Sequence, residues 1–177
     1  MTDSKIITLQ KAGELEKAFN AIVDSYSERL YWHVRRFMEN HDDTNDLLQD
    51  IFIKIWKGLP YFRGDSQLYT WLYRIATNEA LNRLQKDKRK SHVELEKISS
   101  EIDDDPYFNG TAMQRELHKA ISALPYKQRI VFNLRYFDEM KYEDMSRITG
   151  TSVGALKASY HHAYTKISEM LKKIFIN

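Results

Sequence analysis

The sequence predicts an all-α protein built from two small helical domains that are joined by an acidic linker. Only three prolines and six glycines occur among 177 residues, and good helix formers fill long stretches, which argues against a β-sandwich or barrel. Apolar residues recur at three- and four-residue steps in both halves of the chain. Between the halves this periodicity is lost. A length of 177 residues suits two small domains.

The N-terminal half is expected to contain three helices. Apolar periodicity predicts a helix over residues 14–40. A second helix is expected from a cap at Asp43 to about Leu59, where a Gly-Leu-Pro sequence ends it. After a loop at residues 61–66, a long helix is predicted from about 67 to 90.

The segment over residues 91–110 is acidic and weakly periodic. It carries six carboxylates against one lysine, a net charge of −5 in a chain whose total is +2, so the flanking parts together carry +7. Two basic blocks beside an acidic bridge are compatible with nucleic-acid binding by both blocks. We therefore expect domains at 1–90 and 113–177, with an acidic flexible linker at 91–112.

The C-terminal domain carries a helix-turn-helix pattern. Tyr142, Met145 and Ile148 predict a short amphipathic helix, Gly150 suits a tight turn, and Ser152 can cap the longer helix that follows. Such a unit places the start of its second helix in the DNA major groove. The alternative is an ordinary helical hairpin with a solvated face. The candidate DNA-binding residues are Ser152, Val153, Gly154, Ala155, Lys157, Ser159, His161 and His162.

A mixed acidic and apolar stripe marks the second predicted helix. Asp46, Gln49, Asp50, Ile53 and Trp56 lie opposite its core-facing residues. Exposed large apolar groups among carboxylates favour a protein interface. The alternative is a core tryptophan at the end of a helix.

Several functional classes are not supported by the sequence. With zero cysteines there is no disulfide framework, thiolate metal site or cysteine nucleophile. Adjacent histidines, His161 and His162, point about 100° apart on a helix and form no metal site. We find no phosphate-binding glycine loop or nucleophile elbow, and so expect no enzyme, cofactor or metal. No signal peptide or membrane-length apolar run is present, so a cytoplasmic protein is expected.

Two sets of motifs resemble the sigma-70 family of RNA polymerase sigma factors, in particular its extracytoplasmic-function (ECF) group. In the C-terminal half, residues 124–132 (LPYKQRIVF), 141–145 (KYEDM) and 150–157 (GTSVGALK) resemble region 4. In the N-terminal half, residues 45–52 (NDLLQDIF) resemble region 2.2. The segments FRGDS and TWLYRIATN resemble regions 2.3 and 2.4.

The resemblance implies a role for each motif. Region 2.2 grips the β′ clamp helices of core RNA polymerase, and Asp46, Gln49 and Asp50 fall on the matching positions. Regions 2.3 and 2.4 open and read the −10 element, while region 4 binds the −35 element and the β flap. Promoter DNA, bacterial core polymerase and an anti-sigma factor are the implied partners. The implied −10 residues are Tyr61, Phe62, Gly64, Ser66, Trp71, Arg74, Asn78 and Asn82.

The residue types suit this chemistry. An extruded base is held by a pocket and an aromatic face, each stack contributing roughly 1–3 kcal/mol. Trp71 has two interpretations, a stack on DNA or a wedge between helices. The family often carries arginines after Lys157, whereas Ser159, His161 and His162 stand here. The recognition helix is therefore less cationic than usual for the family.

The expected function is an alternative, ECF-type sigma factor that binds core polymerase and directs transcription initiation. Two promoter elements about two helical turns apart are separated by roughly 70 Å. A 20-residue linker spans at most about 70 Å, so one chain can reach both. The alternative is a free-standing helix-turn-helix regulator, which explains the C-terminal motif but leaves the acidic stripe and residues 62–78 unused.

Overall fold

The computed structural model describes residues 2–38, 40–88 and 110–176, and within those ranges the secondary structure is helical without a strand. The expected all-α fold class is confirmed. The linker predicted at 91–112 lies outside the described residues as far as residue 109. Among the described helices, none has both the length and the apolar character needed to cross a membrane.

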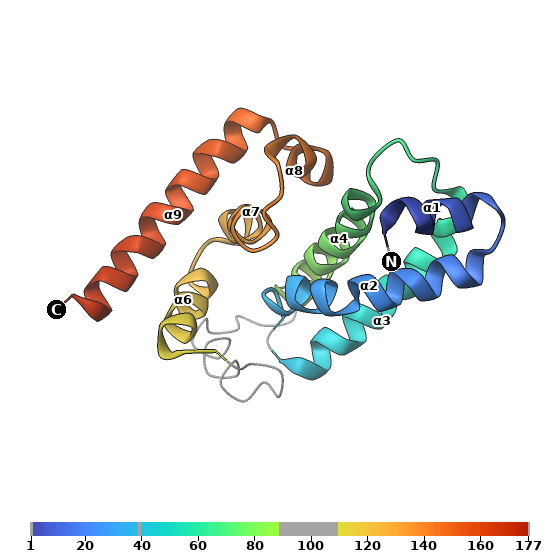
Figure 1. Cartoon of the computed structure of the whole chain (residues 1–177). Coiled ribbons are helices and arrows are strands. Elements are labelled where there is room, and N and C mark those ends of the chain that lie inside the picture. Colours follow the sequence, from blue (N-terminus) through green and yellow to red (C-terminus); the bar gives the residue numbers. More distant parts are fainter. Residues whose placement is uncertain (1, 39, 89–109, 177) are drawn as a thin grey trace.

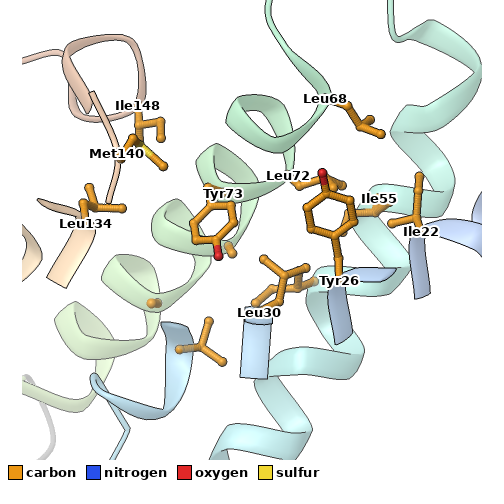
Figure 2. Packing of buried hydrophobic residues seen from close by; sticks show 14 of the residues in the cluster. Ile22, Tyr26, Leu30, Ile55, Leu68, Leu72, Tyr73, Leu134, Met140 and Ile148 are labelled. Atoms are coloured by element: carbon orange, nitrogen blue, oxygen red, sulfur yellow. The ribbon is translucent and has the colours of Figure 1, made fainter. Parts of the chain in front are cut away.

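The N-terminal half is a bundle in which three long helices surround an apolar core. Ile22, Leu30, Ile55 and Leu72 meet in this core and are buried (Figure 2). After Gly58 the chain forms a single 3-10 turn and then a loop, and the last helix of this half begins after that loop. The elements are α1 (Asp3–Lys11), α2 (Leu15–Arg35), α3 (His41–Gly58), η1 (Leu59–Tyr61) and α4 (Leu68–Lys88).

Three features of this half differ from the sequence prediction. The cap of α3 is Asn40, whose side-chain oxygen accepts a hydrogen bond from the Asp43 backbone N–H at 2.8 Å. Asp43 instead supplies a carboxylate in the first turn, which receives the Asn40 amide at 3.0 Å. Helix α2 correspondingly ends at Arg35 rather than near residue 40. Helix α1 was not expected, because only Ile6 of its nine residues is fully buried.

The C-terminal half contains the predicted helix-turn-helix. Gly150 adopts the left-handed conformation with φ of 70°, which a residue without a Cβ enters at low cost. The Ser152 hydroxyl accepts a hydrogen bond from the Ala155 N–H at 3.3 Å and caps the last helix. The elements are α6 (Ala112–Ser122), α7 (Tyr126–Tyr136), α8 (Tyr142–Thr149) and α9 (Val153–Phe175).

The two halves are packed against each other. Figure 1 shows α7 and α8 beside α4. Leu134, Met140 and Ile148 belong to the same buried cluster as Leu72 and Tyr73, and Figure 2 shows them on facing sides of this contact. A separate cluster holds α6, α7 and α9 together. The chain therefore has one continuous core across its two halves and a satellite core in the C-terminal half.

His118 of α6 lies where the C-terminal half approaches α2. Its ring stacks on Phe137, with centroids 5.8 Å apart. Burial, and then the charges of Arg36 and Arg35, lower the pKa of His118 from about 6.5 to about 4. Since the unfolded chain binds this proton more tightly, protonation favours unfolding. The contribution of His118 is fully present above pH 6.5 and is lost as the pH falls toward 4.

We predict that His118→Gln makes stability less sensitive to acid. Between pH 7 and pH 5 the native chain should lose up to about 2 kcal/mol more of its unfolding free energy than the variant does. Urea denaturation at both pH values measures this difference, and comparing each protein with itself removes any constant packing effect. His162→Gln, at an exposed position of α9, is the control. Identical pH dependence in all three proteins would contradict the prediction.

Candidate nucleic-acid and protein interfaces

The predicted stripe on α3 forms one exposed face. Asp46, Gln49 and Asp50 are exposed, and the larger apolar groups that follow remain open to solvent, with Ile53 50% and Trp56 43% exposed. The opposite face of the helix is buried in the core. The α-helical repeat produces this separation, because residues three and four apart share a face.

Trp56 is held in place while it stays accessible. Its ring meets the ring of Phe19 of α2 edge to face, with centroids 5.2 Å apart. One side of the indole is thus packed and another faces solvent. The side chain is a pre-positioned apolar group among carboxylates, an arrangement that suits an anchor in a protein interface.

The loop between η1 and α4 lines a cavity of about 420 Å³. Tyr61 stands at its edge and is 81% exposed. Gly64 has a φ of 81°, so the loop turns through a backbone conformation that favours glycine. Arg63 and Arg74 also line the cavity, and they supply cationic groups beside the exposed tyrosine ring. Aromatic and guanidinium groups around a cavity of this kind are suited to a nucleotide base and its phosphates.

Two aromatic residues of this region have packing roles. Phe62 is buried and its ring lies 5.1 Å from that of Trp71. The indole of Trp71 also covers Gly58, where an added Cβ would meet its ring at 3.0 Å. Trp71 therefore packs against the end of α3 and the loop, and it is half-buried and lines the cavity. Both rings shape the cavity from behind, and Tyr61 is the ring that faces outward.

Helix α4 presents polar residues beyond the cavity. Arg74, Asn78 and Asn82 follow one another at four-residue intervals and are exposed on one face. Ser66, before the helix, is half-buried and lines the cavity. Arg74 belongs both to this polar face and to the cavity lining, so the cavity borders the polar face of α4.

The recognition helix α9 presents its first turns to solvent. Ser152, Gly154, Ala155 and Lys157 are exposed, whereas Val153 is half-buried. Farther along, Ser159 is half-buried, and His161 and His162 are exposed. Burial of Leu156, Ala163 and Ile167 fixes the opposite face, so the predicted helical alternation is observed.

The Lys157 ammonium group lies over an aromatic ring. This group lies 5.7 Å from the centroid of the Tyr142 ring of α8, within cation–π range. The two helices of the helix-turn-helix thereby hold the charge near the start of α9. A positive charge there, next to the unpaired N–H groups of a helix N-terminus, favours phosphate.

A buried polar cluster between the two halves was missed by sequence reasoning. Asp138, in the α7–α8 turn, accepts a hydrogen bond from Arg36 at 3.2 Å and one from the Tyr73 hydroxyl at 3.3 Å. Its other oxygen lies 2.9 Å from Nδ1 of His33. Nε2 of His33 lies 2.9 Å from the hydroxyl of Thr77 in α4. No local pattern reveals this cluster, because its members are spread over about a hundred positions of the chain.

The Asp138 carboxyl keeps its charge although it is buried. The Asp138 and Arg36 side chains are each 7% exposed, and His33 is fully buried. Burial alone would raise the pKa of the Asp138 carboxyl, but His33, Arg36 and the Tyr73 hydroxyl together hold it below its ordinary value. Burial, and then Asp138, raises the pKa of Tyr73 to about 12, so this phenol remains a donor.

Two sequence families match the chain, and they divide it as the motifs do. Sigma-70 region 2 matches residues 22–90, and Sigma-70, region 4 matches residues 114–167. The first match covers the α3 stripe, the loop cavity and α4. The second covers the helix-turn-helix. The exposed surfaces described above therefore fall within recognised sigma-70 regions.

Relatives match over nearly the whole chain. The RNA polymerase sigma-H factor of Pseudomonas aeruginosa is 30% identical, over 97% of this chain and 95% of the relative. The ECF RNA polymerase sigma-E factor of Escherichia coli K12 is also 30% identical, over 98% and 96%.

Solved structures share the fold. The sigma factor RpoE of Bartonella quintana, in complex with the anti-sigma factor NepR, matches with a TM-score of 0.73 and 24% identity, over 88% of this chain and 98% of that one. CnrH, in complex with the cytosolic domain of CnrY, matches with a TM-score of 0.70 and 22% identity, over 97% of both chains. Both likenesses include the two halves. With full-length relatives at 30% identity and matches to regions 2 and 4, the chain belongs to the ECF group of the sigma-70 family of RNA polymerase sigma factors.

Proposed function

We propose that this sigma factor divides polymerase binding and promoter recognition among the three surfaces described above, with the α3 stripe docking on the β′ clamp helices of core polymerase. The observation that carries this assignment is the coincidence of Asp46, Gln49, Asp50, Ile53 and Trp56 on one exposed face. Desolvated aromatic anchors surrounded by charge give an interface both binding energy and orientation.

The loop cavity and the polar face of α4 are proposed to open and read the −10 element. Tyr61 offers its ring to an extruded base, and Arg63 and Arg74 bring positive charge to the adjoining phosphates. Asn78 and Asn82 continue the surface along α4. The free energy for separating the DNA strands then comes from base stacking and phosphate contacts that only the separated strand makes. No catalytic step is involved, so we propose that the protein is not an enzyme.

The recognition helix is proposed to bind the −35 element. The small side chains Gly154 and Ala155 let the backbone of α9 approach the duplex, while Ser152 and Lys157 face phosphates. His161 and His162 stand farther along, where they reach the flanking backbone. The β flap of core polymerase is a second proposed partner of this half.

The partners and location follow from the same assignment. We propose separate functional domains at 1–90 and 113–177 with a linker at 91–112, which the separate region 2 and region 4 matches support. An anti-sigma factor is a proposed partner, since one similar solved chain, RpoE of Bartonella quintana, is described in complex with the anti-sigma factor NepR. We also propose a cytoplasmic location, because the protein would act there on core polymerase.

We predict that Asp46→Lys with Asp50→Lys weakens binding to core polymerase at least tenfold without unfolding the chain. The two substitutions reverse charge on an exposed face, so the penalty falls on the interface. Glu143→Lys with Glu169→Lys makes the same change in net charge at exposed positions of the C-terminal half and is the control. Binding of labelled protein to purified core polymerase gives the affinities. Equal weakening by both pairs would indicate a general charge effect and remove the stripe from the interface.

Tyr61→Ala is expected to impair strand opening more than initial docking. The ring is exposed and its loss leaves the core intact, whereas Phe62 is buried and its removal would disturb the fold. Loss of one base stack corresponds to roughly 1–3 kcal/mol. Permanganate reactivity of unpaired thymines across the −10 region measures opening. Tyr164→Ala, at an exposed tyrosine of α9, is the control, and normal reactivity in Tyr61→Ala would exclude this ring.

Lys157→Ala should weaken binding to the −35 element and lower its salt dependence by about one unit of slope, because one phosphate contact is lost. The slope is obtained from affinities for a −35 duplex over a range of salt concentrations. Lys166→Ala removes the same charge from an exposed site farther along α9 and should leave the slope unchanged. An unchanged slope in Lys157→Ala would take this lysine off the list of contacts.

A further inference from the structure

Helix α1 is anchored to the N-terminal bundle although only one of its residues is fully buried. That residue is Ile6, which belongs to the core. At the start of the helix, the Asp3 carboxylate accepts a hydrogen bond from the Tyr26 hydroxyl of α2 at 2.7 Å. Figure 1 shows α1 beside α2, and the two helices are in contact. Helix α1 therefore has a fixed position against the bundle.

The last turn of α1 ends in a Schellman motif. Gly13 adopts the left-handed conformation with φ of 79°, and its N–H donates to the Gln10 carbonyl at 3.1 Å. The Glu14 N–H donates to the Leu9 carbonyl at 3.0 Å. These two bonds satisfy carbonyl groups at the helix end and hold its backbone. The Gln10 side chain therefore extends from a well-defined position.

Gln10 joins α1 to the turn that carries Tyr61. Its Nε2 donates to the carbonyl of Leu59 at 3.1 Å and to that of Phe62 at 3.3 Å. Because both partners are acceptors, the amide must present its NH2 group here, and it uses both hydrogens. Leu59 and Phe62 are buried at the two ends of the turn, whereas Tyr61 is 81% exposed. Gln10 thus fixes the ends of the turn and leaves the ring of Tyr61 accessible.

We propose that Gln10 is a positioning residue for the −10 element, acting from α1 through the turn on the ring of Tyr61. The inference rests on the proposed function, which gives this ring a base to stack on. A ring that is held in place before DNA arrives loses less conformational freedom on binding. Residues 63–65, beyond the turn, are exposed, which makes hydrogen bonds to the backbone important for holding this loop. The region 2 match begins at residue 22, so α1 lies outside it.

The positioning role is tested first in the free protein, by amide hydrogen exchange. Gln10→Glu keeps the size of the side chain but turns a carboxylate toward two carbonyl oxygens. The Phe62 N–H, which donates to the Leu59 carbonyl at 3.2 Å, should then exchange about tenfold faster, while the N–H of Leu72 in the core is unaffected. Gln10→Met removes both donors without adding charge and should act in the same direction. Equal acceleration at Phe62 and Leu72, or none at Phe62, would overturn the local role.

Gln114→Glu is the matched control. It makes the same substitution at an exposed position of α6. There Oε1 of Gln114 accepts the Thr111 N–H at 2.6 Å, and a glutamate oxygen can accept the same bond. Exchange at Phe62 should match that of the native protein in this variant. Faster exchange in Gln114→Glu as well would indicate a general charge effect and overturn the role of Gln10.

The consequence for DNA is tested with the complex of this protein and core polymerase. In Gln10→Glu, permanganate reactivity across the −10 region should fall about tenfold, with unchanged affinity for core polymerase and for a −35 duplex. A general loss of structure would instead weaken all three and overturn the inference. Normal opening in Gln10→Glu together with impaired opening in Tyr61→Ala would overturn the inference alone. Normal opening in both variants would overturn the proposed function of the loop.

Discussion

The burial of Asp138 between His33 and Arg36 is the interaction on which the arrangement of the two halves depends. Apolar packing alone is tolerant of small shifts, because it has no preferred direction. A buried carboxylate with three hydrogen-bonding partners does not tolerate such shifts, because each lost partner leaves a desolvated polar group without a hydrogen bond. Together the two effects explain why separate recognition regions form one continuous core in this structure.

Helix α4 takes part both in this contact and in the proposed DNA surface, because its two faces carry different residues. Arg74 and Asn78, two proposed DNA contacts, are exposed, while Tyr73 is buried in the contact with the C-terminal half. The same helix that is proposed to open the −10 element thus also holds the −35 reader in place.

Much of the candidate site could be predicted from the sequence, because it follows from helical periodicity. The α3 stripe and the exposed start of α9 lie where three- and four-residue spacing puts them, and Gly150 and Ser152 mark the turn by their own conformational preferences. The sequence predicts the N-cap of α3 at Asp43, three residues after the observed cap at Asn40, because both Asn and Asp suit that position. The packing of Trp71 and the pairing of Asp138 depend on residues distant in the chain, on which one sequence carries no signal.

As a sigma factor, this protein is expected to give core RNA polymerase a promoter preference that the enzyme lacks. The most direct measurement is transcription in vitro by core polymerase on a library of genomic promoter fragments, with 5′ ends mapped in the presence and absence of the protein. We expect a new set of start sites that share two upstream elements about two helical turns apart. An identical set of transcripts with and without the protein would contradict the account.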